Sequence, residues 1–279
     1  MAFPYAASRD ALYFPESCED LLLQYPHTGI LSLAAEASRL AYLRSETDSK
    51  ERHRLTENLE NAGFQPPQIL AKTALGAYAY AAFRTRDRLA LISFRGTHVD
   101  DAKDLCTNIN FKLEAWITQG KVHSGFKASA LALQEEVLSW LANTSYESLV
   151  LTGHSLGGSI ATLMSSLTGP CKLITIGCPR VGNDTFASSL DHVQQVRLVN
   201  CCDVVTRVPT PELGYSHSSV ATYITRNGSL KENPDHGGVL IDQNLARLLY
   251  LPVSVVPNNV KLRDLADHAP SNYIRALFK

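Results

Sequence analysis

Long apolar runs, an excess of one charge and low-complexity segments are all missing from this 279-residue sequence. The most apolar stretch, residues 248–256, falls well short of the roughly 18–20 residues of a membrane-spanning helix, so we expect no transmembrane segment. The 26 basic and 27 acidic side chains leave a net charge of -1. Because nucleic-acid binding depends on clustered Lys and Arg against phosphates, we expect no nucleic-acid partner.

The six cysteines show neither zinc-ligand spacing nor a CxxC pair, and the sequence contains no HExxH. No cluster of His, Cys and Asp has ligand spacing either, so we expect neither a metal site nor a cofactor. The composition favours free thiols in a reducing compartment. Residues 1–20 lack a basic start followed by an apolar run, which predicts no secretory leader and leaves cytoplasmic location or leaderless export open.

Strands and helices alternate along most of the chain. After an irregular segment up to residue 30, the apolar spacing and breaker residues predict helices at 31–43, 49–61, 126–141, 155–167 and 186–190. Strands are predicted at 69–72, 77–84, 88–94, 148–152, 172–177 and 195–201. This rhythm predicts an α/β fold with a mainly parallel sheet and helices on both faces. No linker or repeat divides the chain, so we expect one domain over residues 1–279.

A Gly-x-Ser-x-Gly motif, Gly153-His154-Ser155-Leu156-Gly157, lies where a predicted apolar strand meets a helix of small residues. A nucleophile at such a turn has a strained backbone, and side chains two positions away on either side would collide with the crossing elements. The turn raises Ser155 Oγ above the sheet at the positive end of the next helix. A phosphate loop is excluded because no Lys-Ser or Lys-Thr follows the glycines. Ser155 is therefore the predicted nucleophile.

Five further blocks, in order, make the chain resemble the class 3 lipases, the filamentous-fungal family within the α/β-hydrolases that also includes feruloyl esterases. The blocks are Ile92-Ser93-Phe94-Arg95-Gly96-Thr97, Val122-His123-Ser124-Gly125-Phe126, Gly177-Cys178-Pro179-Arg180-Val181-Gly182-Asn183, Val199-Asn200 with Asp203-Val204-Val205 and Pro209, and Asp267-His268 before Tyr273. Together they cover roughly residues 74–275. The resemblance implies the α/β-hydrolase fold.

The resemblance also implies a catalytic triad of Ser155, Asp203 and His268. Asp203 follows a predicted strand, His268 precedes the C-terminal helix, and their chain order is the one this fold requires. It further implies an oxyanion hole made by the backbone N–H groups of Leu156 and Thr97.

Other residues could in principle take two of these roles. His217 matches a different family block and is the alternative base, while Asp184 and Asp191 are alternative acids if the strand before Asp203 is misassigned. We expect His154 to point away from Oγ because of its place in the elbow, and His123 to be a structural histidine.

The resemblance places a lid at about residues 98–111. The segment holds Asp100, Asp101, Lys103 and Asp104 but few large apolar residues, which argues against strong activation of the enzyme at an oil surface. A simple solvated loop would explain this composition equally well. Residues 248–256 could line an acyl pocket or touch a membrane, but core packing is favoured because apolar runs are usually buried.

These inferences together predict serine-dependent hydrolysis of carboxylic esters, with a lipid or small ester as substrate and transient contact with lipid surfaces. A phospholipase A or galactolipase with the same triad is the alternative enzyme. A non-catalytic binding module is disfavoured because all three triad residues are present.

Overall fold

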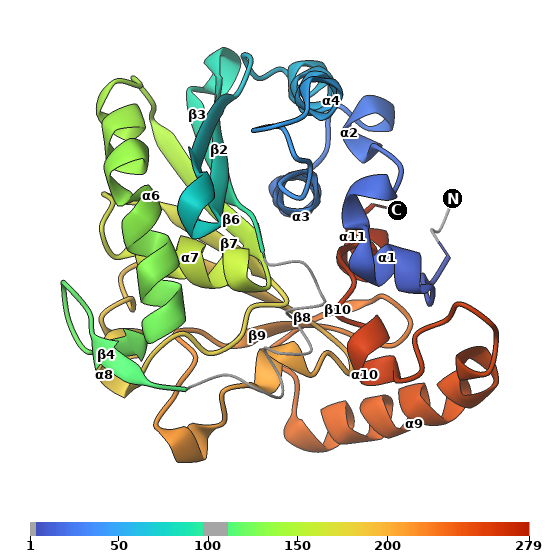
Figure 1. Cartoon of the computed structure of the whole chain (residues 1–279). Coiled ribbons are helices and arrows are strands. Elements are labelled where there is room, and N and C mark those ends of the chain that lie inside the picture. The colour runs from blue at the N-terminus through green and yellow to red at the C-terminus, as the bar shows by residue number, and fades with distance from the viewer. Residues whose placement is uncertain (1–3, 97–110, 279) are drawn as a thin grey trace.

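The computed structural model describes residues 4–96 and 111–278. An eight-stranded sheet runs through the molecule in the order β1-β2-β3-β6-β7-β8-β9-β10 (Figure 1). Its strands are β1 (Gln68–Lys72), β2 (Ala77–Arg84), β3 (Leu89–Phe94), β6 (Ser148–His154), β7 (Lys172–Ile176), β8 (Gln194–Asn200), β9 (Ala221–Ile224) and β10 (Leu230–Glu232). The five central strands β3, β6, β7, β8 and β9 pair in parallel, and the outer pairs are antiparallel. A separate hairpin joins β4 (Leu113–Ala115) to β5 (Lys121–His123).

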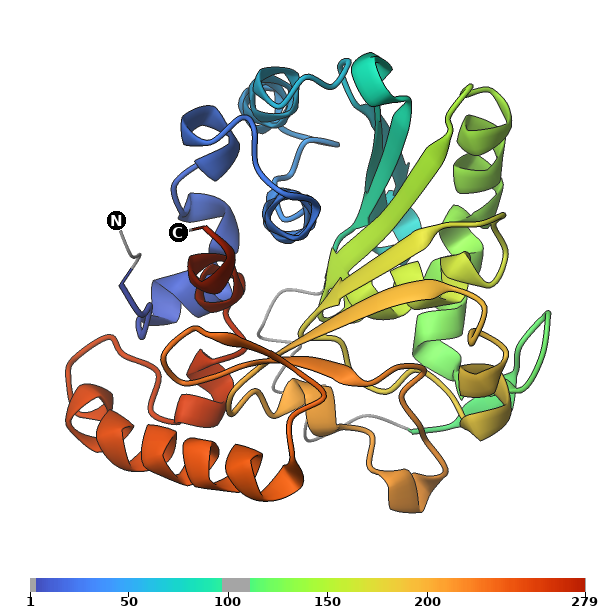
Figure 2. The ribbon, with the colours of Figure 1, turned by 180° about the vertical axis from the view of Figure 1, so that it is seen from behind.

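Helices cover both faces of the sheet (Figures 1 and 2). The α-helices are α1 (Arg9–Tyr13), α2 (Leu21–Gln24), α3 (Ile30–Leu40), α4 (Ser49–Asn61), α6 (Ser124–Ala142), α7 (Leu156–Ser165), α8 (Asp184–Ser188), α9 (His236–Ser254), α10 (Arg263–Ala266) and α11 (Pro270–Leu277). Single turns of 3-10 helix lie at Pro15–Ser17, Thr73–Leu75, Thr85–Asp87, Val205–Arg207 and Pro211–Leu213. One core joins α3, α4 and α11 to the sheet, and the other joins α6 and α7 to its opposite face.

Continuous apolar strands explain why the parallel strands lie in the centre. All six residues of β3 are buried, as are six of the seven residues of β6, which is the pattern of strands covered on both faces. Strand β3 pairs with β6 in a register that sets Phe94 opposite Gly153. The end of β3 therefore lies beside the turn that carries Ser155.

The expected α/β-hydrolase architecture, with a mainly parallel sheet between two helical layers, is confirmed. Helix α4 and strand β2 have the predicted bounds. Three expectations were wrong in part: residues before 30 include α1 and α2, the helix expected to reach residue 43 ends at Leu40, and most of residues 248–256 are exposed, although Tyr250 is buried. Within the described ranges, no helix combines the length and apolar character needed to span a bilayer.

Candidate active site

Ser155 occupies a strained turn between β6 and α7. Its φ of 57° and ψ of -126° place a non-glycine residue in a sparsely populated region, as a nucleophile elbow requires. A Cβ on Gly153 would overlap the backbone of Gly157, and one on Gly157 would overlap Phe94 of β3. The two glycines therefore allow β3, the turn and α7 to meet.

His268 lies between Ser155 and Asp203. Its Nε2 is 3.0 Å from Ser155 Oγ, and its Nδ1 is 2.9 Å from Asp203 Oδ2. Because the carboxylate only accepts, Nδ1 carries the proton, and Nε2 is left to accept from the serine hydroxyl. All three side chains are almost fully buried. The structure thus brings together the three residues that the sequence selected.

Asp203 is held by two further donors. Its Oδ1 accepts the N–H of Val205 at 2.9 Å, and its Oδ2 accepts the hydroxyl of Tyr273 at 2.5 Å. Burial, and then the negative charge of Asp203, raise the pKa of Tyr273 well above its ordinary value, so this hydroxyl remains a donor. Charge-assisted bonds of this kind fix the orientation of the carboxylate that faces His268.

His154 of the elbow braces the backbone of His268. Its Nε2 is 2.8 Å from the carbonyl oxygen of His268, and its Nδ1 is 2.8 Å from Tyr42 Oη. A carbonyl only accepts, so Nε2 carries the proton and the Tyr42 hydroxyl donates to Nδ1. Burial, with a smaller contribution from His268, lowers the pKa of His154 well below its usual value, which keeps it neutral. As expected, the ring does not serve Ser155; the role that Tyr42 and His154 share was not predicted.

The residues expected to form an oxyanion hole are placed only in part. Leu156 is the first residue of α7, where backbone N–H groups have no partner within the helix. Thr97 and lid residues 98–110 lie outside the described residues. The last described residue before them, Gly96, is close enough to the elbow that a Cβ there would overlap His154 O and Tyr42 Oη. A cleft of about 530 Å³ borders Gly96 and Leu156.

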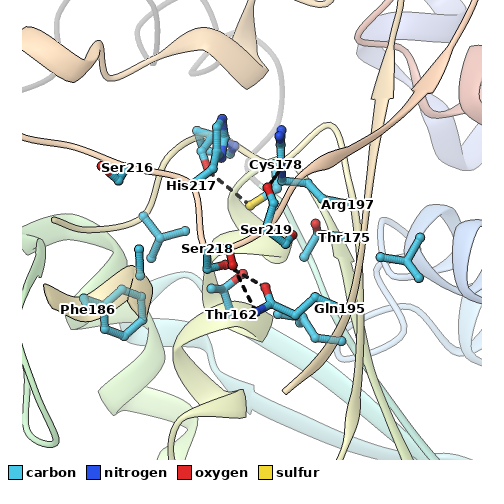
Figure 3. A pocket seen from close by; sticks show the side chains of 15 residues that line it. Thr162, Thr175, Cys178, Phe186, Gln195, Arg197, Ser216, His217, Ser218 and Ser219 are labelled. Carbon is cyan, nitrogen blue, oxygen red and sulfur yellow. Dashed lines mark hydrogen bonds between the residues drawn. The ribbon is translucent and has the colours of Figure 1, made fainter. Parts of the chain in front are cut away.

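The alternative base His217 is occupied elsewhere. Its Nε2 lies 2.8 Å from Thr206 O, and it lines a small cavity with Cys178 and Arg197 (Figure 3). Burial lowers the pKa of His217 well below its ordinary value, with Arg197 as a smaller cause. Neither hydrogen bonding nor this cavity connects it to Ser155 among the described residues.

The remaining alternatives have local structural partners. His123 caps α6, where Nδ1 accepts the N–H of Gly125 at 3.1 Å. Asp184, in the first turn of α8, accepts a hydrogen bond from Ser216, and Asp191 is exposed beyond that helix.

One buried group of potential metal ligands is present in the described part of the chain: Cys201, Cys202 and Asp267, whose ligand atoms lie within 4.8 Å of one another. The carboxylate of Asp267 already accepts from Tyr5 at 2.8 Å and from the N–H of Cys202 at 2.9 Å, and it forms an ion pair with Arg263 at 2.8 Å. A hydrogen bond with Cys202, followed by burial, raises the pKa of Cys201 and favours the thiol over the metal-binding thiolate. These contacts indicate a structural role.

The elbow, the central parallel strands and the two helical layers define an α/β-hydrolase fold. The triacylglyceride lipase of Rhizomucor miehei superposes with a TM-score of 0.61 at 20% identity, covering 88% of this chain and 91% of that one. Lipase II of Rhizopus niveus gives a TM-score of 0.56 at 22% identity and covers 74% of this chain and 82% of that one.

Sequence comparison leads to a family. Residues 91–213, which include Ser155 and Asp203, match the family model described as Lipase (class 3). A secreted mono- and diacylglycerol lipase 1 from Fusarium solani is 34% identical over 165 residues, covering 53% of this chain and 47% of that protein. A lipase from Rhizopus niveus is 30% identical over 159 residues, covering 50% and 39%. The chain thus spans about half or less of these relatives.

Proposed function

We propose that the protein hydrolyses carboxylic esters of lipid-like substrates through an acyl-enzyme on Ser155. The observation that carries the proposal is the continuous chain from Ser155 Oγ through both nitrogens of His268 to Asp203, with lengths of 3.0 and 2.9 Å. A buried hydroxyl, a base in the right tautomer and an orienting carboxylate are the elements of nucleophilic acyl transfer.

In the proposed reaction, His268 Nε2 takes the hydroxyl proton while Ser155 Oγ adds to the ester carbonyl. Collapse of the tetrahedral adduct breaks the acyl C–O bond, and His268 returns the proton to the leaving alcohol. Water then repeats the sequence on the acyl-enzyme and releases the carboxylic acid. Asp203 holds the tautomer throughout and stabilises the imidazolium.

In this proposal the backbone N–H of Leu156, at the start of α7, stabilises the negative charge that develops on the carbonyl oxygen of the substrate. We assign the second backbone donor to Thr97. Removing one such donor typically costs about 10²–10³ in rate. Tyr273 acts through Asp203, and His154 with Tyr42 acts through the backbone of His268, so these three are positioning residues.

The lipid-like substrate class is supported by the class 3 lipase match and by relatives named as mono- and diacylglycerol lipases. A phospholipase A or galactolipase would use the same groups and differ in contacts with the headgroup. The hydrogen-bonded chain of Ser155, His268 and Asp203 argues against a non-catalytic binding module.

Hydrolysis of p-nitrophenyl esters from acetate to palmitate, below and above substrate aggregation, tests the proposal. We expect Ser155→Ala to lose at least about 10⁴-fold in kcat. Ser165→Ala is the matched control, because the Ser165 hydroxyl bonds only within its own helix, at 2.8 Å to Thr162 O, and should change kcat little. Equal activity of Ser155→Ala and wild type would refute the proposal.

A further inference from the structure

Helix α9 carries an unusually apolar exposed side. A surface helix normally turns apolar residues toward the core and polar residues toward water. In α9, Ala246 and Tyr250 are buried, but most of the large apolar residues are exposed. This exposed set, called the α9 face, includes two residues that directly follow the helix and comprises Leu240, Ile241, Leu245, Leu248, Leu249, Leu251, Val255 and Val256. Exposed fractions of 64% at Ile241, 61% at Leu248 and 75% at Val255 show that the neighbouring elements leave this face open.

The inward side of α9 buries Ala246 and Tyr250 and also carries polar side chains that hydrogen-bond to the neighbouring elements. Asp242 Oδ2 accepts the hydroxyl of Tyr223 and the N–H of Arg226, each at 2.9 Å. Gln243 donates to Cys201 O at 2.8 Å. Arg247 pairs with Asp264 at 2.7 Å. These contacts fix the rotation of the helix, so its leucines cannot turn inward without breaking buried polar bonds.

The position of α9 connects this face to the candidate site. Both views show α9 along the outer edge of the molecule, next to α10 (Figures 1 and 2). Helix α10 ends two residues before His268, and its Asp264 carbonyl accepts the N–H of Val204, the neighbour of Asp203. The matched family segment ends at residue 213, so α9 lies outside it.

The exposed apolar residues and the few charges of the α9 face indicate what kind of partner it binds. The face gathers eight large apolar residues, each between 39% and 75% exposed, and a contiguous exposed apolar patch of this kind marks an interaction site. Two copies meeting along one convex helix would cover only part of it, whereas a stable dimer buries about 800 Å² on each partner. In the described segment 236–257 the Asp, Glu, Lys and Arg side chains are Asp242 and Arg247, and both bond to the protein rather than facing outward. The one histidine of this segment, His236, is the first residue of the helix.

We propose that the α9 face docks the protein on the uncharged surface of aggregated lipid. A fluid lipid surface can surround a convex helix, and its apolar interior takes up leucine side chains without needing a charged partner. The inference rests on the proposed function, because a lipid-ester hydrolase requires its site to reach such a surface. Docking through α9 keeps α10 and the adjacent His268 loop near the substrate.

Flotation of the full chain with phosphatidylcholine vesicles tests the docking. Leu248→Gln/Leu249→Gln keeps residues of good helix propensity on the exposed side. We expect its partition coefficient to fall at least about tenfold, because each methylene withdrawn from lipid weakens partition several-fold. Leu75→Gln is the matched control: it is 67% exposed at the opposite edge of the sheet and should bind as wild type does. Binding should also be insensitive to salt and to added anionic lipid.

Three results would overturn the inference: unchanged partition of the double variant, an equal loss in Leu75→Gln, or a wild-type dimer in light scattering that the double variant dissociates. Hydrolysis of monomeric p-nitrophenyl butyrate is measured in parallel. Its dependence on Ser155 reports the proposed function separately. If Ser155→Ala hydrolysed this ester as fast as wild type, the proposed acyl-enzyme chemistry would be refuted. The docking inference would still stand if only the double variant lost vesicle binding.

Discussion

Replacing Asp203 by Asn tests the tautomer of His268, on which the proposed chemistry depends. Asp203 Oδ2 accepts from His268 Nδ1 at 2.9 Å and from Tyr273 at 2.5 Å, and Oδ1 accepts the N–H of Val205 at 2.9 Å. An asparagine can keep its carbonyl oxygen toward the Val205 N–H. Its NH₂ group then faces His268 and favours the tautomer with the proton on Nε2, which can no longer accept from Ser155.

The expected loss in kcat for Asp203→Asn is about 10⁴-fold, the size found when this tautomer is reversed in other triads. At room temperature this corresponds to roughly 5.5 kcal/mol of transition-state stabilisation. The assay is kcat on p-nitrophenyl butyrate at pH 7–8, with thermal unfolding to verify the fold. Asp184→Asn is the matched control: Asp184 lies at the start of α8 and accepts a hydrogen bond from Ser216, so we expect near wild-type activity. A loss below tenfold in Asp203→Asn, or an equal loss in Asp184→Asn, would refute the assignment.

Three further predictions concern the scaffold. Tyr42→Phe leaves buried His154 Nδ1 without its hydrogen-bond donor, so the free energy of unfolding in urea should fall by about 1–3 kcal/mol. We expect this variant to lose less kcat than Asp203→Asn does. Unchanged stability would contradict the assigned tautomer of His154. Burial lowers the pKa of His123 to about 4, so the unfolded chain binds its proton first and the protein loses stability as the pH falls from about 6.5 to 4. His123→Asn keeps a good N-cap, and its Tm should fall less than that of wild type between pH 7 and pH 5. An identical fall in both proteins would show that His123 is not the source of the lost stability. Gly157→Ala should overlap Phe94 and cost at least about 2 kcal/mol, whereas Gly169→Ala, with no atom within 4 Å, should be nearly neutral in Tm; equal effects would argue against the packing described at the elbow.

The elbow and the main strands could be predicted because their signals are local. Apolar runs and a Gly-x-Ser-x-Gly motif mark β6, Ser155 and α7 within a few residues of sequence. The edge strand β10 could not be found this way, because its three residues are all exposed and have no alternating pattern. The pairing of Tyr42 with His154 joins residues 112 positions apart, and no periodicity reports it.

Residues 248–256 show where a sound rule predicts the wrong location for most of a segment, since Tyr250 is buried but its apolar neighbours are exposed. Apolar runs are usually buried, so this one was expected in the core. The interactions of Asp242, Gln243 and Arg247 instead turn polar side chains of α9 inward, and their partners come from β9, from α10 and from Cys201, the residue after β8. Such a polar network is tertiary, so the orientation of the helix could be known only once the fold placed its partners.

Reaction with a fluorophosphonate, mapped by mass spectrometry, tests the central claim most directly. The account predicts a single adduct on Ser155, formed at a comparable rate by wild type and His217→Ala and abolished in His268→Ala. His217 is a fair control because it is a histidine bonded to Thr206 O, in a cavity apart from Ser155. An adduct on another serine, or labelling lost in His217→Ala and retained in His268→Ala, would contradict the account.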